Sequence, residues 1–279
     1  MEKILLAVDA IHPSNNALEF ACYLSKVTKS KVTAVFLENL LGIETPVLYP
    51  ADSMEVAAER INFQLDDHSA KVKFIENNIK RFKDACINRE VTVNVTRDRG
   101  IPLKELINES RFADVMILEA SITFFKLFDG TPSEFVKKVL SHSECPVIIA
   151  PETFEPIGEL IFTYDGSASS LFAIKQFAHF FPQFKDRKVN IVQVTGDETP
   201  QDPAKYKFNK WLQAHYSDFH FEMLQGKSDD QLFEYLFLKK NVFIVMGAYG
   251  RNVLSRFFKH SRADLIIKTV TQPIFIAHP

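Results

Sequence analysis

The sequence has few cysteines and no long apolar run, and both absences restrict what the protein can be. Its 279 residues include three cysteines, Cys22, Cys86 and Cys145, which are far apart in the sequence and form no C-x-x-C pair. This odd number argues against a disulfide framework, so we expect reduced thiols and a cytoplasmic protein. No apolar stretch approaches the roughly 20 residues of a membrane span, and the apolar run at the start is too brief for a signal peptide.

The sequence also lacks an excess of charge of one sign and the common catalytic motifs. Its 33 Lys and Arg residues nearly balance 35 Asp and Glu residues, for a net charge of −2. We therefore expect neither nucleic acid nor a membrane as a partner. The motifs G-x4-G-K-[ST], H-E-x-x-H and G-x-S-x-G are absent, and the eight histidines are scattered. These absences predict no catalytic residues and no metal ligands, so we expect a protein that is not an enzyme.

One pattern of apolar strands and amphipathic helices is present, and it occurs twice. The strand at 3–8 ends at Asp9 and precedes a helix that starts near Ser14, while the strand at 158–164 ends at Asp165 and precedes a helix at 169–180. Three further strands correspond between the copies: 31–37 with 188–194, 114–118 with 241–246, and 146–150 with 272–277. The first copy also has a long helical region at 54–88, a strand at 91–95, and helices at 102–109 and 133–141.

This alternation predicts an α/β protein made of two repeated, doubly wound parallel-sheet domains. The proline-containing segment at 151–156 is the expected linker, so the domains would span 1–151 and 157–279. In such sheets, ligands bind at the carboxyl ends of the strands, where the strand order reverses. Asp9, Asp165, the chain after Val194 and the turn at Gly247 are all strand ends, so each copy can form one crevice.

The turn after the strand at 241–246 has the features of a phosphate-binding loop. Gly247 and Gly250 lie three residues apart, and backbone amides can approach an anion closely where no Cβ intervenes. Ser261 opens a predicted helix at 261–269, whose first amides and hydroxyl can receive a phosphate. The basic residues of the segment are Arg251, Arg256, Lys259 and Arg262. The alternative is an ordinary strand–turn–helix connection with a solvated basic face.

At these residues the chain resembles a tandem universal stress protein. That family has the signature G-x2-G-x9-G-[ST] after its fourth strand, which Gly247, Gly250 and Ser261 match, although His260 replaces the third glycine. The aspartate after the first strand and the closing strands of the form x-Pro-[VI]-x-[IV]-Ala extend the resemblance across the chain. The resemblance implies a Rossmann-like fold of the adenine nucleotide alpha-hydrolase type in each half.

The resemblance also implies a pocket for ATP or another adenine nucleotide, with Mg²⁺ as a companion ion in some members. It places Asp165 near the base and ribose and Val194 against the adenine. The alternative for Asp165 is an N-cap or turn residue, and Val194 taken alone is most simply a core residue. The pocket would also contain Thr163 and Tyr164 beside the ribose, and Met246, Gly247, Gly250, Arg251, His260, Ser261 and Arg262 around the phosphates. The His260 imidazole would either reduce the depth of the pocket or, when protonated, contact a phosphate.

The first copy departs from this signature. Alignment of the fourth strands places Glu119 on Gly247 and Ile122 on Gly250, so that a carboxylate replaces the turn of amides. At an effective dielectric constant near 20, two like charges ~4 Å apart repel by about 4 kcal/mol. We therefore predict that the first half does not bind ATP and is either a structural partner or a site for a different ligand.

Together these features predict a cytoplasmic stress-response protein that binds an adenine nucleotide in its second half, as a sensor or scaffold without dedicated catalysis. The alternative is an interaction module in which both pockets have decayed. That alternative expects dimerisation through an exposed apolar edge strand such as Pro273–Ala277. The two halves are expected to pair within one chain, and a homodimer remains the alternative.

Overall fold

The computed structural model describes residues 1–38, 68–98, 100–124, 130–195, 205–225, 228–247, 271–277 and 279. They form two compact units, Glu2–Cys145 and Pro146–Pro279, with Met1 assigned to the second. The domain limits expected from the sequence, 1–151 and 157–279, follow the repeat along the chain and remain a prediction. The expected loop and helix start at 39–67 and the expected helix at 261–269 lie outside the described residues.

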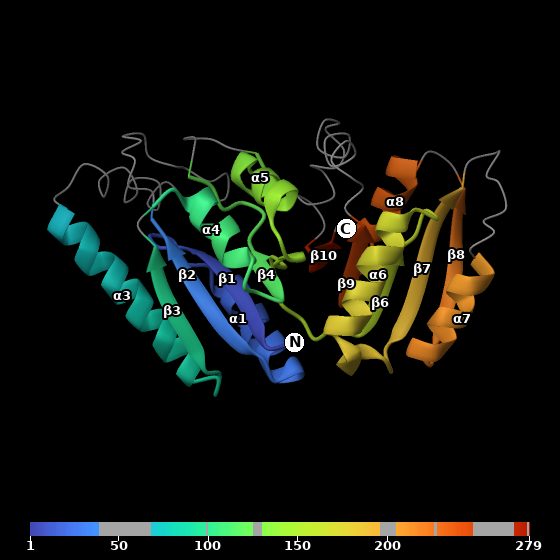
Figure 1. The fold of residues 1–279 in the computed structure, drawn as a ribbon, viewed down its shortest axis with the longest axis horizontal. Coiled ribbons are helices and arrows are strands. Elements are labelled where there is room, and N and C mark those ends of the chain that lie inside the picture. Colours follow the sequence, from blue (N-terminus) through green and yellow to red (C-terminus); the bar gives the residue numbers. More distant parts are fainter. Residues whose placement is uncertain are drawn as a thin grey trace. The chain divides into compact units, whose positions relative to one another are not determined.

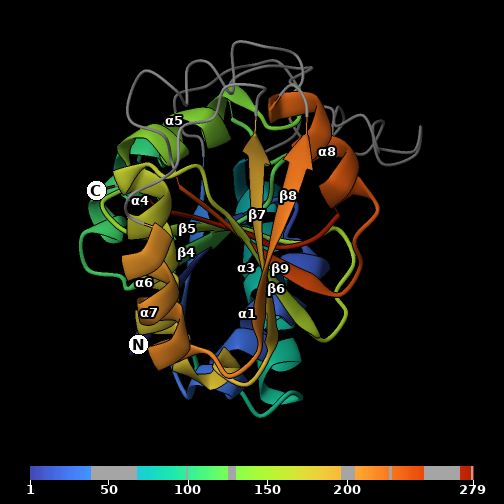
Figure 2. The same ribbon diagram turned by 90° about the vertical axis from the view of Figure 1, so that its right-hand side faces the viewer.

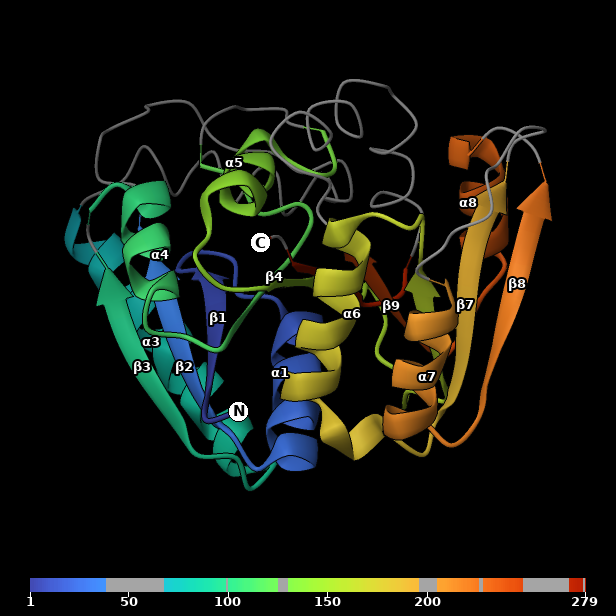
Figure 3. The same ribbon diagram turned by 45° about the vertical axis from the view of Figure 1, so that its right-hand side comes forward.

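The unit Glu2–Cys145 contains a parallel sheet with the strand order β3-β2-β1-β4 (Figure 1). Helices cover both faces of this sheet, as the position of α3 behind the strands and α4 in front of them shows (Figure 3). The elements are β1 Lys3–Asp9, α1 Asn15–Thr28, β2 Lys31–Leu37, α3 His68–Ile87, β3 Val93–Asp98, α4 Pro102–Ser110, β4 Val115–Leu118 and α5 Glu134–His142.

The unit Pro146–Pro279 has the strand order β5-β10-β9-β6-β7-β8. Its strands are parallel except for β5, which pairs antiparallel with β10. Figure 2 shows the arrows of β7 and β8 pointing the same way. The elements are β5 Val147–Ile149, β6 Glu159–Thr163, α6 Ala168–Phe180, the short helix η1 Pro182–Phe184, β7 Lys188–Thr195, α7 Lys205–His215, β8 Phe219–Gln225, α8 Ser228–Phe237, β9 Val242–Gly247 and β10 Ile274–Ala277.

The strand register confirms the internal repeat. Ile4 of β1 pairs with Val115 of β4, and the corresponding Leu160 of β6 pairs with Phe243 of β9. Counting four residues onward from Val115 and from Phe243 reaches Glu119 and Gly247. The alignment that places a carboxylate in the first copy where the second copy has a glycine is therefore correct. The expected α/β class, with largely parallel sheets, is also confirmed.

The expectation that Pro273–Ala277 forms an exposed edge strand is wrong. The strand β10 pairs with β9 on one side and with β5 on the other, and all four of its residues are buried. A short apolar strand can be either an edge or a central strand, and its sequence alone does not name its neighbours. In the structure, the strand that closes the first copy supplies the pairing that covers β10.

Serine side chains begin three of the helices that follow strands. The hydroxyl oxygen of each of the serines Ser14, Ser133 and Ser167 accepts a hydrogen bond from the backbone N–H of the residue three positions later. That N–H lies in the first turn of the helix and has no partner within the helix itself. This fixes where α1, α5 and α6 start relative to the preceding strand ends. Among the described residues, no helix is both long and apolar enough to cross a membrane.

Phenylalanine rings form the centre of the second unit. Phe177 of α6 is fully buried, and its ring lies 5.0 Å from that of Phe243 of β9 and 5.4 Å from that of Phe275 of β10, measured between centroids. Both pairs are edge-to-face, which is a favourable arrangement for aromatic rings. Phe177 therefore joins the helix that begins after Asp165 to the strand that ends at Gly247.

We predict that Phe177→Ala lowers the free energy of unfolding of this unit by about 3–5 kcal/mol, because it removes buried apolar surface and leaves a cavity. The single tryptophan, Trp211, lies in α7 of the same unit, so its fluorescence during urea denaturation reports on this unit. Phe237→Ala at the exposed end of α8 is the matched control and should cost less than about 1 kcal/mol. Equal losses for the two variants would contradict the assigned core.

Candidate functional site

Three residues expected at the nucleotide site lie at one edge of the sheet in the second unit. Asp165 follows β6, Val194 is near the end of β7, and Gly247 ends β9. The strand β6 lies between β7 and β9 and is parallel to both, so the carboxyl ends of the three strands are neighbours. The chain leaves β6 toward β7 on one side and later returns to β9 on the other. This is the reversal point at which α/β sheets bind ligands.

Asp165 is exposed and stabilises its own turn. Its Oδ1 accepts a hydrogen bond from the N–H of Ser167 at 2.9 Å, and the intervening Gly166 has a φ of 79° that favours glycine. Asp9, the equivalent residue, accepts from the N–H groups of Ile11 and His12 at 2.8 and 3.2 Å. The role as a turn residue is therefore present in both copies. A carboxylate has more acceptor positions than this turn uses, so ribose binding by Asp165 remains a prediction.

The other described candidate residues differ in burial. Thr163 is buried and its hydroxyl donates to the carbonyl oxygen of Val245, while the buried Tyr164 ring packs on Phe208 with centroids 4.6 Å apart. These two side chains thus take part in the core. Val194 is half-buried and available as an apolar wall, whereas Met246 is 6% exposed.

Close packing requires a glycine at position 247. A Cβ built on it would lie 2.6 Å from the backbone nitrogen of Ser170 and 2.7 and 2.8 Å from the carbonyl carbon and oxygen of Ser169. The end of β9 therefore touches the backbone of the first turn of α6, and no side chain fits between them. The sequence suggests that a glycine is needed here so that an anion can come close to the backbone. In the structure, the group that comes close to the backbone of Gly247 is the start of α6.

Five candidate residues cannot be placed. Gly250, Arg251, His260, Ser261 and Arg262 lie outside the described residues, so their grouping around a phosphate remains a prediction.

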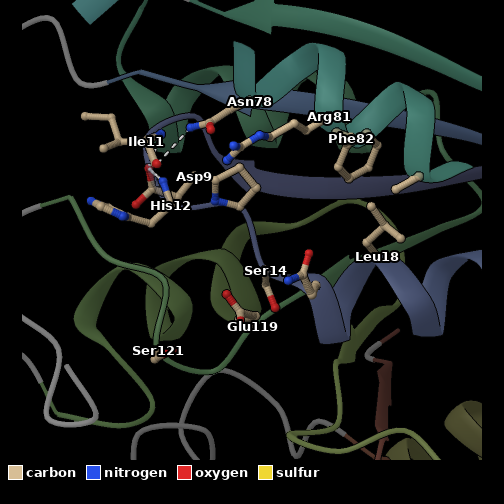
Figure 4. Close-up of a pocket in the computed structure, with 13 residues that line it drawn as sticks. Asp9, Ile11, His12, Ser14, Leu18, Asn78, Arg81, Phe82, Glu119 and Ser121 are labelled. Carbon is tan, nitrogen blue, oxygen red and sulfur yellow. Dashed lines mark hydrogen bonds between the residues drawn. The ribbon is translucent and has the colours of Figure 1, made fainter. Parts of the chain in front are cut away.

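A cavity of about 500 Å³ lies at the corresponding reversal point of the first unit (Figure 4). Glu119, which replaces Gly247, lines it together with Pro13 and Ser14, which directly precede α1. Where the second unit brings a strand end into contact with a helix start, the first unit has a carboxylate side chain and an open space. The rest of the wall comes mainly from the turn after β1, from α1 and from α3, and α3 contributes Asn78 among others.

The sequence analysis did not anticipate the part of this cavity that α3 forms. The Nδ2 of Asn78 donates to the carbonyl oxygens of Ala10 and Ile11 at 3.1 and 2.9 Å, and so holds the turn after β1. Arg81, one turn further along α3, extends over the cavity toward Asp9 and His12 (Figure 4). The sequence feature that could have indicated this contact is an asparagine, Asn78, within the apolar stripe of α3. A polar side chain that is buried at such a position needs hydrogen-bond partners from another segment.

A second charged feature distinguishes the first unit. Glu38 follows β2 and forms an ion pair with Arg97 of β3, and the Glu38 side chain is almost fully buried. The hydrogen bond to Glu38 raises the pKa of the Arg97 guanidinium above its usual value. By the strand register, the second unit has Thr195 and Met223 at these positions. At these two positions the first unit therefore has charged side chains where the second unit has uncharged ones.

We predict that Gly247→Ala destabilises the second unit by about 1–3 kcal/mol, because the added Cβ must displace backbone rather than a movable side chain. Gly158→Ala is the control in the same unit, since its Cβ would meet only the carbonyl oxygen of Asn241, at an ordinary 3.6 Å. Urea denaturation followed by Trp211 fluorescence measures both variants. An unchanged free energy of unfolding for Gly247→Ala would show that stability does not depend on close contact between the end of β9 and the start of α6.

The comparisons with known proteins extend over the whole chain. No family model matches the sequence. A universal stress protein from Synechocystis sp., Slr1230, is 20% identical over 98% of this chain and 99% of its own length. A universal stress protein from Archaeoglobus fulgidus superposes with a TM-score of 0.66 at 17% identity, covering 99% of this chain and 96% of that one.

A putative universal stress protein from Pseudomonas aeruginosa superposes with a TM-score of 0.62 at 13% identity, covering 100% of this chain and 94% of that one. Both structural matches cover almost the full length of the relative, so the similarity includes both units and not only a single repeat. The resemblance predicted from the sequence is thereby confirmed, and the chain has the fold of two-domain universal stress proteins along its entire length.

Proposed function

We propose that the protein is a stress-response protein that binds ATP or a related adenine nucleotide in the unit Pro146–Pro279. It acts as a sensor or scaffold through the bound nucleotide, without dedicated catalysis. The observation that carries this proposal is the position of Asp165, Val194 and Gly247 on adjacent strand ends at the reversal point of one sheet.

These residue types suit the parts of a nucleotide. A carboxylate at Asp165 accepts hydrogen bonds from ribose hydroxyl groups, and the half-buried Val194 offers an apolar surface to the base. The segment after Gly247 would supply backbone amides and the basic residues Arg251 and Arg262 to the phosphates.

The first unit is proposed to bind something other than a triphosphate. Its cavity of about 500 Å³ lies within the range of about 300–1,000 Å³ typical of small-ligand sites, so size does not exclude a nucleotide. Charge argues against one, because the carboxylates of Glu119 and Asp9 line the cavity and outnumber the guanidinium of Arg81 there. The alternative of an interaction module with two decayed pockets is weakened, since its expected dimerisation strand β10 is already paired on both sides.

ATP is expected to stabilise the second unit. At a hundredfold excess over the dissociation constant, a ligand that binds only the folded state adds about 2.7 kcal/mol. The urea midpoint of the Trp211 fluorescence transition should therefore rise with millimolar ATP. Asp165→Ala should reduce this rise, whereas Asp186→Ala, which removes an exposed carboxylate elsewhere in the same unit, should not. An unchanged midpoint with ATP, with or without Mg²⁺, would count against nucleotide binding.

The nucleotide is also expected to label one half of the chain. After irradiation with an azido-ATP analogue, peptides from 151–279 should carry the label, and peptides from 1–150 should not, because Glu119 repels phosphate in the first unit. Excess unlabelled ATP should suppress the labelling, which controls for nonspecific attachment. Equal labelling of the two halves would contradict the assignment of the site to the second unit.

A further inference from the structure

Two cysteines that are far apart in the sequence are in contact in the first unit. Cys22 lies in α1 and Cys86 in α3, and these two helices pack against each other. Both residues are buried, with exposed fractions of 4% and 1%, and neither is in a disulfide. Their thiols are joined by a hydrogen bond. The third cysteine, Cys145, is buried elsewhere in the unit.

The two thiols have opposite electrostatic environments. The hydrogen bond that Cys86 donates lowers the pKa of Cys22, and burial opposes this effect. The positive charges of Arg89 and Lys26 lower the pKa of Cys22 further, and the negative charge of Glu19 opposes them. The same hydrogen bond, together with burial, raises the pKa of Cys86. A thiolate is the reactive form of cysteine, so Cys22 is the better nucleophile of the pair.

Arg89 holds the two helices together beside this pair. Its Nη2 donates to Oε1 of Glu19 in α1 at 2.7 Å, and its Nη1 donates to the carbonyl oxygen of Ala85 in α3 at 3.1 Å. Glu19 is three residues before Cys22, and Arg89 is three residues after Cys86, so the ion pair lies next to the thiols along both helices. These two hydrogen bonds hold the guanidinium group of Arg89 near Cys22.

The cavity of the first unit leads toward the thiols. Leu18 and Phe82, each one helical turn before Cys22 and Cys86 respectively, line the cavity, as does Ala85. Figure 4 shows Leu18 and Phe82 approaching each other between α1 and α3. An oxidant the size of a water molecule that enters the cavity therefore meets side chains that lie one helical turn from each thiol.

We propose that Cys22 and Cys86 are an oxidation site for a hydroperoxide such as hydrogen peroxide, and that they form a reversible disulfide between α1 and α3. The Cys22 thiolate attacks one peroxide oxygen, the O–O bond breaks, and hydroxide leaves, giving a sulfenic acid at Cys22. The Cys86 sulfur then attacks the Cys22 sulfur and displaces the oxygen as water. In sum, two thiols and one hydrogen peroxide give one disulfide and two water molecules, and a dithiol reductant reverses the change.

The disulfide would fix the wall of the cavity. It joins α1, which begins after the turn that carries Asp9, to α3, which carries Asn78 and Arg81. Its formation requires the sulfurs to move from hydrogen-bonding distance to a bond of about 2.05 Å, and the packing of the two helices provides this proximity. This inference stands independently of nucleotide binding, because it concerns the other unit.

The test uses the full chain, first reduced and then treated with hydrogen peroxide while folded. Thiols counted after unfolding should fall from three to one per chain, and digestion should yield one cross-linked peptide pair that contains Cys22 and Cys86. Cys145→Ser should still form this pair, because Cys145 takes no part and burial raises its pKa to about 12. Cross-links that include Cys145, or no cross-link below the peroxide concentration that oxidises methionine, would overturn the proposal.

A second variant separates the roles of the two thiols and does not depend on disulfide formation. In Cys86→Ser, a dimedone probe should trap a sulfenic acid at Cys22, whereas in Cys22→Ser the same probe should label Cys86 much less. Circular dichroism confirms that each variant is folded before it is treated. Labelling of Cys86 equal to that of Cys22 would contradict the assignment of Cys22 as the attacking thiolate.

Discussion

In each repeat, the first strand pairs in parallel with a neighbour on both sides. This pairing determines where a ligand site can form in this protein. In the first unit β1 lies between β2 and β4, and in the second β6 lies between β7 and β9. The helices that follow must leave toward opposite faces, so the turns after these central strands separate and leave room at the carboxyl edge. Asp9 and Asp165 stand at that edge because each follows its central strand. The cavity found in the first unit lies at this edge.

The two repeats use this edge differently because of a few substitutions. Gly247 permits contact between a strand end and the backbone of Ser169 and Ser170, whereas Glu119 places a carboxylate beside an open cavity. The ion pair of the buried Glu38 with the partly exposed Arg97 adds further charged groups in the first unit. The same backbone arrangement thus differs between the two copies in the side chains at the carboxyl edge of the sheet. Fusion of the copies in one chain allows this divergence, because each copy has its own sequence.

Much of this arrangement could be predicted from the sequence, and the reasons are local. Apolar runs that end in aspartate, serine caps and the repeated closing strands identify the elements, and the alternation of strands and helices identifies the sheet type. Features that depend on distant segments could not be predicted in this way. The pairing of β10 with β5, the reach of Asn78 to the turn after β1, and the contact of Cys22 with Cys86 each join residues whose sequence separation carries no signal. The sequence predicts reduced thiols at Cys22 and Cys86 and gives no sign that the two are neighbours in the fold.

The central claim is that only the second repeat kept a turn suited to an anion. Isothermal titration of the full chain with ATP measures the number of sites without a label or a reporter residue. We expect a stoichiometry of one nucleotide per chain. Two equivalent sites per chain, or no binding heat at any temperature tested, would contradict the claim.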